Sequence, residues 1–314
     1  MKRLLSIMLS LLAGHLSYSQ NDSADVEAIR RMVNLTEVVI RSDLNVSSFL
    51  ARVKNDTTFY KAFKNLRVIG FTSMNDIRML DKKGRVVASL QSKTRQIRNN
   101  GCRTMDVLDE KYAGNIYEKD KEFNYYTAEL YASLFFTNGK VCGETNIVSG
   151  THRSARNKSG LEKHKEQLKM LFFNPGKKIP GIPFIGNKLD VFDDDVARFY
   201  HYTIDMDDWN GQSCYVFIIK TKEDLRSAEK DKIVFDNITT WFNTKSMEIV
   251  FRSYDLSYNA AVYDFDVHME VQMTKIASLL VPQIIRYKGN WDVAFKKRER
   301  GVFTATLSDF QLSR

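Results

Sequence analysis

The chain has 314 residues, of which 43% are hydrophobic, 27% charged and 12% aromatic, and its formal net charge is +9. These values exclude a disordered tail and a collagen-like or coiled-coil rod. With only 4 Pro and 15 Gly no long linker divides the chain, so we expect one α+β domain over residues 20–314.

Residues 1–19 predict a secretory signal peptide. A cationic start, Met1–Arg3, precedes the apolar stretch Leu4–Leu16, and the small residues Ser17 and Ser19 follow. The stretch is shorter than the roughly 18 apolar residues that a membrane span needs. We therefore expect cleavage after residue 19, export to the periplasm or the outer membrane of a bacterium, and no transmembrane span in the mature chain.

Three cysteines, Cys102, Cys142 and Cys214, are too few for a disulfide scaffold. In an oxidising compartment one pair can bridge, and the sequence leaves open which. None lies in a Cys-x-x-Cys or a Cys/His cluster, so we expect no metal and no cofactor.

The first half predicts helices and one hairpin. Helical spacing runs from Ser23 to about Asn65, with Asn45 as an N-cap, and Tyr125–Thr137 predicts a buried helix. The runs Leu66–Phe71 and Arg85–Leu90 have strand character and flank the turn Asp81–Gly84.

A basic segment and a proline-rich connection separate the halves. Thr151–Lys169 is the most basic stretch, and its second half begins an amphipathic helix over Leu161–Phe172. We favour a solvated helix face over a patch for anionic lipid or nucleic acid, and expect no nucleic-acid partner, because no aromatic residues interleave the charges. Three of the four prolines lie near residues 174–183, the candidate for an internal join.

The second half predicts a meander of strands with short turns and an Asn-Gly hairpin at Asp208–Gly211. The expected strands are Tyr200–Met206, Ser213–Ile219, Ile233–Phe242, Met247–Tyr258, Val262–Met273, Val281–Tyr287, Trp291–Lys297 and Val302–Leu312. Several strands without intervening helices exclude a doubly wound parallel sheet. The expected fold is an antiparallel, curved β-sheet or half-open β-barrel at about residues 198–312, with a few packing helices.

The strand at 263–273 alternates strictly between apolar and polar residues, which is typical of a sheet covered on one side. Its polar face carries Asp264, Asp266, His268 and Glu270. Because alternate residues on a strand are about 6.6–7 Å apart, one strand cannot bring them together on an ion. We favour a charge ladder with the cations at Lys296, Lys297, Arg298 and Arg300 over a metal or acid/base site.

No catalytic motif is present. The sequence has no Gly-x-Ser-x-Gly elbow, P-loop, dinucleotide fingerprint or His-Glu-x-x-His. We therefore do not expect an enzyme, although a hydrolase whose site is built from distant residues stays open.

The second half resembles the periplasmic lipoprotein carriers (LolA-like) and the wider outer-membrane lipoprotein-sorting superfamily. The resemblance is one of pattern over about Tyr200–Phe310 and rests on the runs YHYTIDMDDWNGQSCYVFIIK, TTWFNTKSMEIVFRSYDL, YDFDVHMEVQM and VFTATLSDF. It implies a half-open antiparallel barrel with a helical lid over an apolar cavity. The chain is longer than a typical carrier, and no gating residue of the family can be placed on it.

The leading hypothesis is an exported, non-enzymatic carrier or binding protein for a lipid or a lipoprotein acyl chain. Its candidate cavity residues are Tyr263, Phe265, Val267, Met269, Trp291 and Phe295. The alternatives are a cell-envelope interaction or assembly protein with an outer-membrane partner, or the hydrolase above. The test is the space between sheet and helix: a pocket of roughly 300–1,000 Å³ supports a carrier, whereas a hollow filled by Phe49, Leu50 and Val53 favours the interaction protein.

Overall fold

The computed structural model describes residues 26–40, 42–148, 170–179, 185–260, 263–293 and 297–312. The expected signal peptide, the basic segment 151–169 and the candidate cavity residue Phe295 lie outside these ranges. Nothing structural follows for them.

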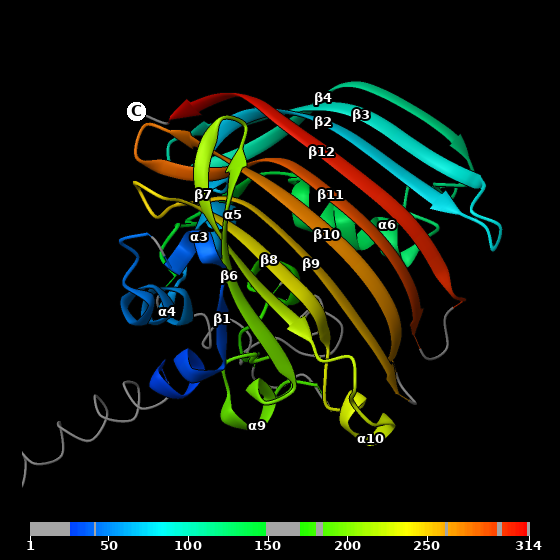
Figure 1. Cartoon of the computed structure of the whole chain (residues 1–314). Coiled ribbons are helices and arrows are strands. Elements are labelled where there is room, and N and C mark those ends of the chain that lie inside the picture. Colours follow the sequence, from blue (N-terminus) through cyan, green and yellow to red (C-terminus); the bar gives the residue numbers. More distant parts are fainter. Residues whose placement is uncertain are drawn as a thin grey trace, which may run out of the picture.

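The described residues form one curved, open sheet, whose strands arch over the helices (Figure 1). Its strands are β1 (Val33–Leu35), β2 (Ile69–Leu80), β3 (Val86–Asn99), β4 (Cys102–Gly114), β5 (Val141–Cys142), β6 (Tyr200–Trp209), β7 (Gln212–Thr221), β8 (Phe235–Asn243), β9 (Ile249–Ala260), β10 (Tyr263–Ile276), β11 (Leu279–Val293) and β12 (Glu299–Leu312). Their order is β1-β6-β7-β8-β9-β10-β11-β12-β2-β3-β4-β5. Neighbours are antiparallel except β1 and β6. The expected α+β fold with a curved antiparallel sheet is confirmed.

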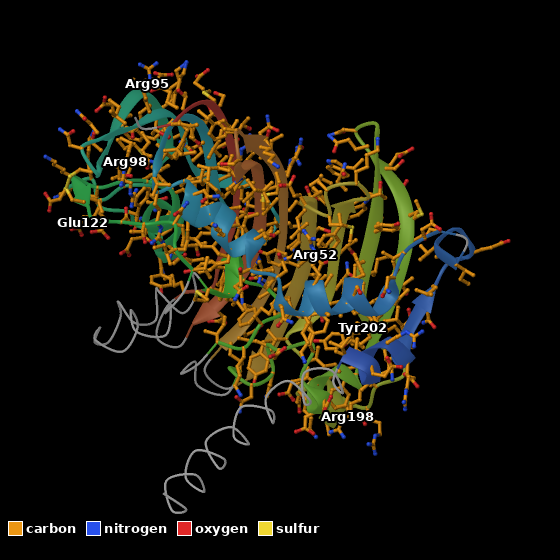
Figure 2. The ribbon with its side chains drawn as sticks, turned by 90° about the vertical axis from the view of Figure 1, so that its left-hand side faces the viewer. Arg52, Arg95, Arg98, Glu122, Arg198 and Tyr202 are labelled. Atoms are coloured by element: carbon orange, nitrogen blue, oxygen red, sulfur yellow. A yellow bond between two sulfur atoms is a disulfide. The ribbon has the colours of Figure 1, made fainter. Side chains whose placement is uncertain are left out.

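The helices are residues 26–32, α3 (Glu37–Ile40), α4 (Val46–Asn55), α5 (Thr58–Asn65), α6 (Tyr126–Phe135), residues 170–173, α9 (Asp194–Ala197) and α10 (Ser227–Lys230). Helices α4, α5 and α6 pack against the concave side of the sheet through buried residues, whereas α10 buries none of its residues. Figure 2 views the molecule along another direction, with Arg95 and Arg98 at one end and Arg198 and Tyr202 at the other.

Asn45 is the N-cap of α4, as expected, and its side chain accepts from the backbone N–H of Ser48 at 2.9 Å.

Alternation along the strands decides which side chains enter the core. On β10, Phe265, Val267 and Met269 are buried whereas Asp266 is exposed, as the sequence pattern predicts. The polar face of β10 therefore lies on the convex, solvated side of the sheet.

The sheet is not confined to residues 198–312. Strand β12 pairs with β2, with Phe303 opposite Ile77, so that the last strand of the chain joins a strand from its first third. Strands β1 to β5 thus all extend the sheet formed by the second half. These strands join the sheet through pairing between residues far apart in the sequence, which the local sequence pattern does not predict.

Two local predictions were wrong. Residues 33–35, expected as helix, form β1, because the edge of β6 offers them backbone hydrogen-bond partners. The segments Val281–Tyr287 and Trp291–Lys297, expected as two strands, belong largely to the single strand β11. Its Gly289 does not end the strand. A Cβ there would lie 1.9 Å from the Tyr287 hydroxyl, so glycine makes room for that ring.

Both hairpin turns are confirmed. Asn210 and Gly211, between β6 and β7, have φ values of 49° and 77°, the left-handed conformation that an Asn-Gly hairpin turn requires. Gly84, between β2 and β3, has φ 78°, and Asp81 accepts from the backbone N–H groups of Lys83 and Arg85.

Candidate functional site

At one end of the concave face, helix α4 fills the space over β7 and β8. The Phe49 ring lies edge-on against Tyr215, Phe217 and Phe242, at centroid distances of 6.0, 5.8 and 5.3 Å. Leu50 and Val53 are buried beside it. We call this region the filled end, because these side chains occupy the space between α4 and the sheet.

Four of the predicted cavity residues come together in the central core. Phe265 and Trp291 are register neighbours on β10 and β11, with ring centroids 4.9 Å apart. Val267 and Met269 are buried next to them. Residue 263 is placed in β10 by its backbone only, and Phe295 is not described. The predicted role of these residues as a ligand wall stays a prediction.

A cavity of about 330 Å³ lies elsewhere, between α5, α6, β2 and β12. None of the four residues above lines it. Its walls are Phe63, Leu66, Arg67, Phe71, Ser73, Gln96, Arg103, Ser133, Leu134, Phe135, Glu144, Phe173, Ala305 and Leu307. We call this region the hollow end. Its volume falls at the lower limit of ligand pockets.

Small sheet residues leave this space open. Ala305 on β12 is fully buried between Phe303 and Leu307 on the same face, and Ser73 lies opposite Leu307 on β2. Phe63 and Phe173 stack at 4.1 Å, and Phe135 approaches Phe173 at 5.9 Å. Aromatic rings therefore surround the cavity without filling it.

A second hollow nearby, of about 430 Å³, is less suited to an apolar ligand. Its lining is mostly polar, namely Phe71, Thr72, Arg95, Gln96, Asp309 and Gln311. The cavity of the hollow end is thus the candidate site.

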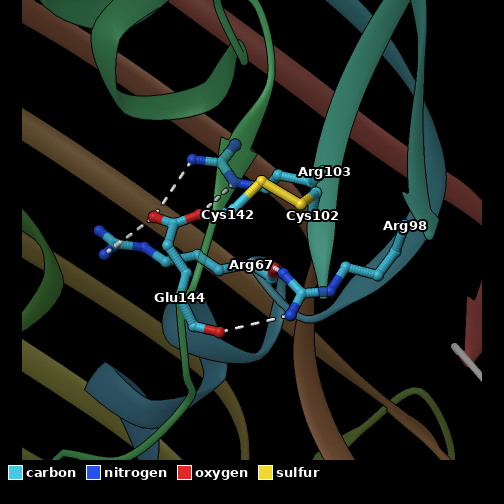
Figure 3. The surroundings of a disulfide bond; sticks show 6 residues. All are labelled: Arg67, Arg98, Cys102, Arg103, Cys142 and Glu144. Carbon is cyan, nitrogen blue, oxygen red and sulfur yellow. Dashed lines mark hydrogen bonds and ion pairs between the residues drawn. A yellow bond between two sulfur atoms is a disulfide. The ribbon is translucent and has the colours of Figure 1, made fainter. Parts of the chain in front are cut away.

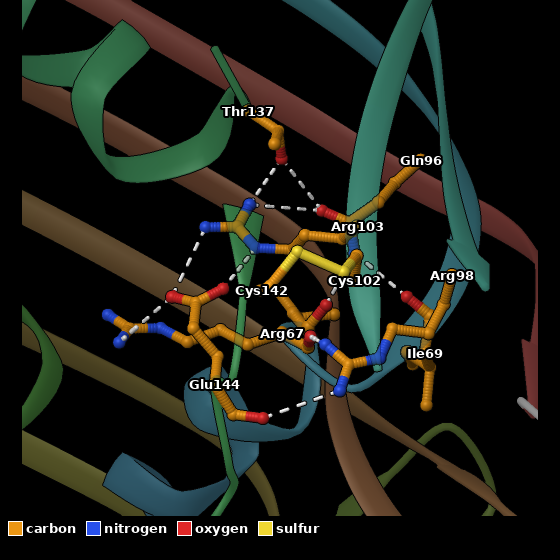
Figure 4. A network of polar contacts seen from close by, with 10 residues as sticks. Arg67, Ile69, Gln96, Arg98, Cys102, Arg103, Thr137, Cys142 and Glu144 are labelled. Atoms are coloured by element: carbon orange, nitrogen blue, oxygen red, sulfur yellow. Dashed lines mark hydrogen bonds and ion pairs between the residues drawn. A yellow bond between two sulfur atoms is a disulfide. The ribbon is translucent and has the colours of Figure 1, made fainter. Parts of the chain in front are cut away.

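One end of the cavity is polar and ordered by hydrogen bonds (Figure 4). Arg103 on β4 forms a forked ion pair with Glu144, through Nε to Oε2 and through Nη2 to Oε1 at 3.3 Å. The Arg103 Nη1 also donates to the Thr137 hydroxyl and to Gln96 Oε1, and Thr137 donates to the same amide oxygen at 3.1 Å. The side chains of Arg103 and Glu144 are 16% and 21% exposed.

The buried amide of Gln96 anchors this network to the sheet. Its Nε2 donates to the carbonyls of Leu66 at 2.6 Å and Ile69 at 2.8 Å. Both donors of the amide are thereby satisfied, which fixes the orientation of the Oε1 that receives Arg103. The guanidinium is consequently held at a set place on the cavity wall.

A disulfide supports the same region (Figure 3). Cys102 on β4 is bonded to Cys142 on β5, while Cys214 is a free, buried thiol. Arg98 adds two further ties, donating to the carbonyls of Arg67 at 2.8 Å and Glu144 at 3.4 Å. These bonds fix Glu144 beside Arg103 and Arg67.

The polar end carries more positive than negative charge. Arg67 Nη1 lies 3.6 Å from Glu144 Oε1, and Lys64 donates to the carbonyl of Ile147. Burial lowers the pKa of Lys64, Arg67 lowers it further, and Glu144 opposes both effects. Arg67 and Arg103 thus approach the carboxylate of Glu144, Lys64 lies close enough to be affected by its charge, and Arg98 contacts the backbone carbonyl of the same residue.

Sequence reasoning missed this site. Ala305 in the run Phe303–Leu307 was a usable signal, because a small residue at the centre of an apolar strand face leaves space opposite it. The three arginines were not recognisable, since they lie on segments that only the tertiary fold brings together.

The charged face of β10 is a ladder of ion pairs, in part with other partners than expected. Arg298 pairs with Asp264, as predicted. Glu270 pairs with Arg286 at 3.3 Å, and His268 bonds Asp255 at 2.6 Å. Within the described ranges, no three His, Cys, Asp or Glu side chains gather as metal ligands.

Among the helices that the structure describes, none has the length and apolar character needed to cross a bilayer.

No family model and no curated protein matches the chain. Six chains of solved structures are similar to it, among them the following three. A DUF1329 family protein from Desulfovibrio piger is 10% identical over 81% of this chain and 90% of its own, with a TM-score of 0.25. A putative outer membrane lipoprotein-sorting protein domain from Vibrio parahaemolyticus is 8% identical over 81% of this chain and 89% of its own, with a TM-score of 0.28. Lipovitellin is 8% identical over 79% of this chain and 26% of its own, with a TM-score of 0.24.

A lipoprotein-sorting domain, the kind of protein that the strand pattern resembles, is thus among the structures similar to this chain. The likeness covers residues of both halves, not only the second. At these TM-scores it does not tell what the chain binds, and the function must be argued from the cavity.

Proposed function

We propose that this protein is an exported, non-enzymatic binding protein for an apolar ligand, a lipid or a lipoprotein acyl chain, in the periplasm. The observation that supports this proposal is the cavity of about 330 Å³ at the hollow end. Eight of its lining residues are apolar: Phe63, Leu66, Phe71, Leu134, Phe135, Phe173, Ala305 and Leu307. Removing an alkyl chain from water into such a site gains roughly 0.8 kcal/mol per buried methylene.

The disulfide supports the exported location. Disulfides persist in oxidising compartments such as the bacterial periplasm and are rare in the cytosol. The Cys102–Cys142 bond closes a long segment, with a sequence separation of 40. It would be maintained after export and would keep the polar end of the cavity in place.

The test uses a neutral fluorescent probe, N-phenyl-1-naphthylamine, and two matched variants. Ser133 lines the cavity on α6, so Ser133→Trp should place an indole in it and weaken probe binding about tenfold. Ser308→Trp, exposed on β12, should bind the probe as the wild type does. Equal binding by both variants, or none by the wild type, would contradict the proposal.

Native mass spectrometry of the protein purified from periplasm provides the second measurement. A mass excess equal to a lipid, lost in Ser133→Trp and kept in Ser308→Trp, is the expected result. A mass equal to the processed chain alone, together with absence of probe binding, would leave the interaction protein as the better explanation.

Two observations favour that second candidate, a cell-envelope interaction protein. Phe49, Leu50 and Val53 fill the space beneath α4, and the sheet has an open edge. Strand β5 pairs only with Cys102 and Arg103, so residues 104–114 of β4 have no outer strand neighbour among the described residues. Val107, Leu108 and Tyr112 on this edge are 58%, 44% and 58% exposed. Open edges with exposed apolar side chains are pairing sites for other chains.

A further inference from the structure

The cavity of the hollow end combines apolar walls with a fixed pair of arginines. Arg67 and Arg103 both line it, and both approach the same carboxylate of Glu144. A ligand that occupied only the apolar part would leave this charged end without a function. A ligand with an apolar chain and a negative head would use both parts.

The Glu144 carboxylate shows where such a head would lie. Arg103 holds it through two nitrogens, the forked geometry by which arginine binds carboxylates and phosphates. Arg67 is less engaged. Among the described residues its guanidinium contacts Glu144 at 3.6 Å, longer than a hydrogen bond, and its side chain is 33% exposed.

The excess of positive charge at this end of the cavity also favours a ligand with a negative head. Among the described residues, Arg67 and Arg103 contact the Glu144 carboxylate and Lys64 is affected by its charge, so cations outnumber carboxylates at this end of the cavity. Lys64 and Arg98 are already bonded to backbone carbonyls. Arg67 is therefore the cation that is best placed to receive a second anion.

We propose that Arg67 and Arg103 form a head-group site for an anionic amphiphile, a ligand with one alkyl chain and a carboxylate or phosphate head, and that Glu144 competes for it. The alkyl chain lies between Phe135, Ala305 and Leu307, and the head lies against Arg67. This inference rests on the proposed function, because it names the ligand class of the same cavity.

Glu144 then acts as an internal competitor. In the ligand-free protein it neutralises part of the guanidinium charge and keeps two half-buried arginines from facing each other unpaired. An incoming head group displaces Glu144 from Arg67 first, since that contact is the weaker one. Arg103 still holds Glu144, and Arg103 is itself held by its hydrogen bonds to Gln96 and Thr137.

The experiment measures the affinity of the full chain for dodecanoate, dodecan-1-ol and inorganic phosphate by calorimetry. Three variants are compared with the wild type: Arg67→Gln, Glu144→Gln and, as a matched control, Arg95→Gln. Arg95 is an exposed arginine of β3 that lines the second, polar hollow but not the cavity, so it controls for anion binding next to the site (Figure 2). Arg103 is left unchanged because it ties β4 to Glu144. Thermal melts followed by circular dichroism verify that each variant is folded.

The expected results separate head from chain. Arg67→Gln should weaken dodecanoate binding about tenfold and leave dodecanol unchanged, as for one lost hydrogen bond to a charged group. Glu144→Gln should strengthen dodecanoate binding several-fold, since a competing charge is removed. Arg95→Gln should change neither affinity.

Three results would overturn the inference in different ways. If Arg67→Gln weakens dodecanoate no more than Arg95→Gln does, the head-group site is wrong while dodecanol binding upholds the proposed function. If phosphate binds as tightly as dodecanoate, the arginines form a site for a free anion and not for an amphiphile. If neither dodecanoate nor dodecanol binds, the proposed function fails as well.

Discussion

At the filled end of the concave face, Phe49 of α4 packs against large sheet side chains, whereas at the hollow end small inward residues of β2 and β12 alternate with large ones. Phe49 lies against three aromatic rings of β7 and β8. Ser73 on β2 and Ala305 on β12 are both buried on the inward face, Ser73 opposite Leu307 and Ala305 opposite Asn75. The same layer of helix on sheet is thus solid or hollow according to the volume of a few sheet residues.

The difference also extends to polarity. The inward face of β2 and β3 carries a buried hydrogen-bonded set, in which Asn75 donates to Ser92 at 3.3 Å and to Thr94 at 3.2 Å. Arg67 and Arg103 continue this polar surface on the wall of the cavity. The filled end has the character of a structural core and the hollow end that of a binding site, where apolar walls meet a few fixed polar groups.

The largest expected effect compares equal truncations at the two ends. Phe49→Ala should lower the free energy of unfolding by about 3–5 kcal/mol, because a buried ring leaves a void among close neighbours. Phe135→Ala should lower it by about 1–2 kcal/mol, since that ring is only partly buried and already borders a cavity. Urea unfolding measures both values. Equal losses would mean that the two ends are packed alike.

The next effect concerns the disulfide that supports the hollow end. Replacing Cys102 and Cys142 with Ala should lower the free energy of unfolding by about 2–4 kcal/mol, because the bond restricts a long segment of the unfolded chain. A reducing agent should lower the wild type to the same value in urea unfolding.

The free thiol Cys214 supplies the control for this experiment. Cys214→Ala keeps the disulfide, so it should remain as sensitive to the reducing agent as the wild type. A double variant as stable as the oxidised wild type would show that the bond contributes nothing to the fold.

The sequence was informative about what depends on local pattern. The alternation of β10, the Asn-Gly turn at Asn210 and the N-cap at Asn45 each follow from a few neighbouring residues, and the structure has all three. The sheet class followed from counting such strands. These features need no knowledge of distant contacts.

The site depends on the opposite kind of information. Arg67, Arg103 and Glu144 come from three separate segments of the chain. The pairing of β12 with β2 brings Ala305 into the wall of the cavity. Pattern analysis correctly placed Phe265 and Trp291 on an inward face. It could not tell whether that face was core or cavity, because this depends on which helix covers it.

A third prediction tests the filled end through the pKa of Lys177. Its Nζ donates to the carbonyls of Val53 and Lys54 at the end of α4 and lies 5.0 Å from the centroid of the Phe192 ring. Burial lowers the pKa of Lys177 from 10.5 to about 8, against the attraction of Asp190. Between these two values the unfolded chain binds the proton more tightly, so the stability of the folded protein rises with pH.

Lys177→Met removes this dependence. From pH 7.5 to 10 the wild type should gain about 1–3 kcal/mol in free energy of unfolding relative to the variant. Lys178→Met, an exposed neighbour, controls for the loss of one lysine. A constant difference between the wild type and Lys177→Met across this range would show that Lys177 is solvated rather than enclosed at the filled end.

The smallest expected effect on stability concerns His268, on the convex face of the sheet, opposite the face that carries the filled end and the hollow end. Burial lowers the pKa of His268, but hydrogen bonds to Asp255 at 2.6 Å and Glu270 at 3.3 Å outweigh it, and the pKa is raised from 6.5. A raised pKa stabilises the folded state fully below pH 6.5, and this contribution disappears as the pH rises through the folded value.

His268→Gln should therefore be less stable than the wild type at pH 5.5, by about 0.5 kcal/mol for an ion pair that is partly exposed, and equal to it at high pH. Urea unfolding at both pH values measures the difference, with His201→Gln, exposed on β6, as the matched control. Because the side chain lies on the outer face of the sheet, saturating dodecanoate should leave the difference unchanged. If the ligand alters it, the two faces of the sheet are coupled, and the hollow end is not the self-contained site that its geometry indicates.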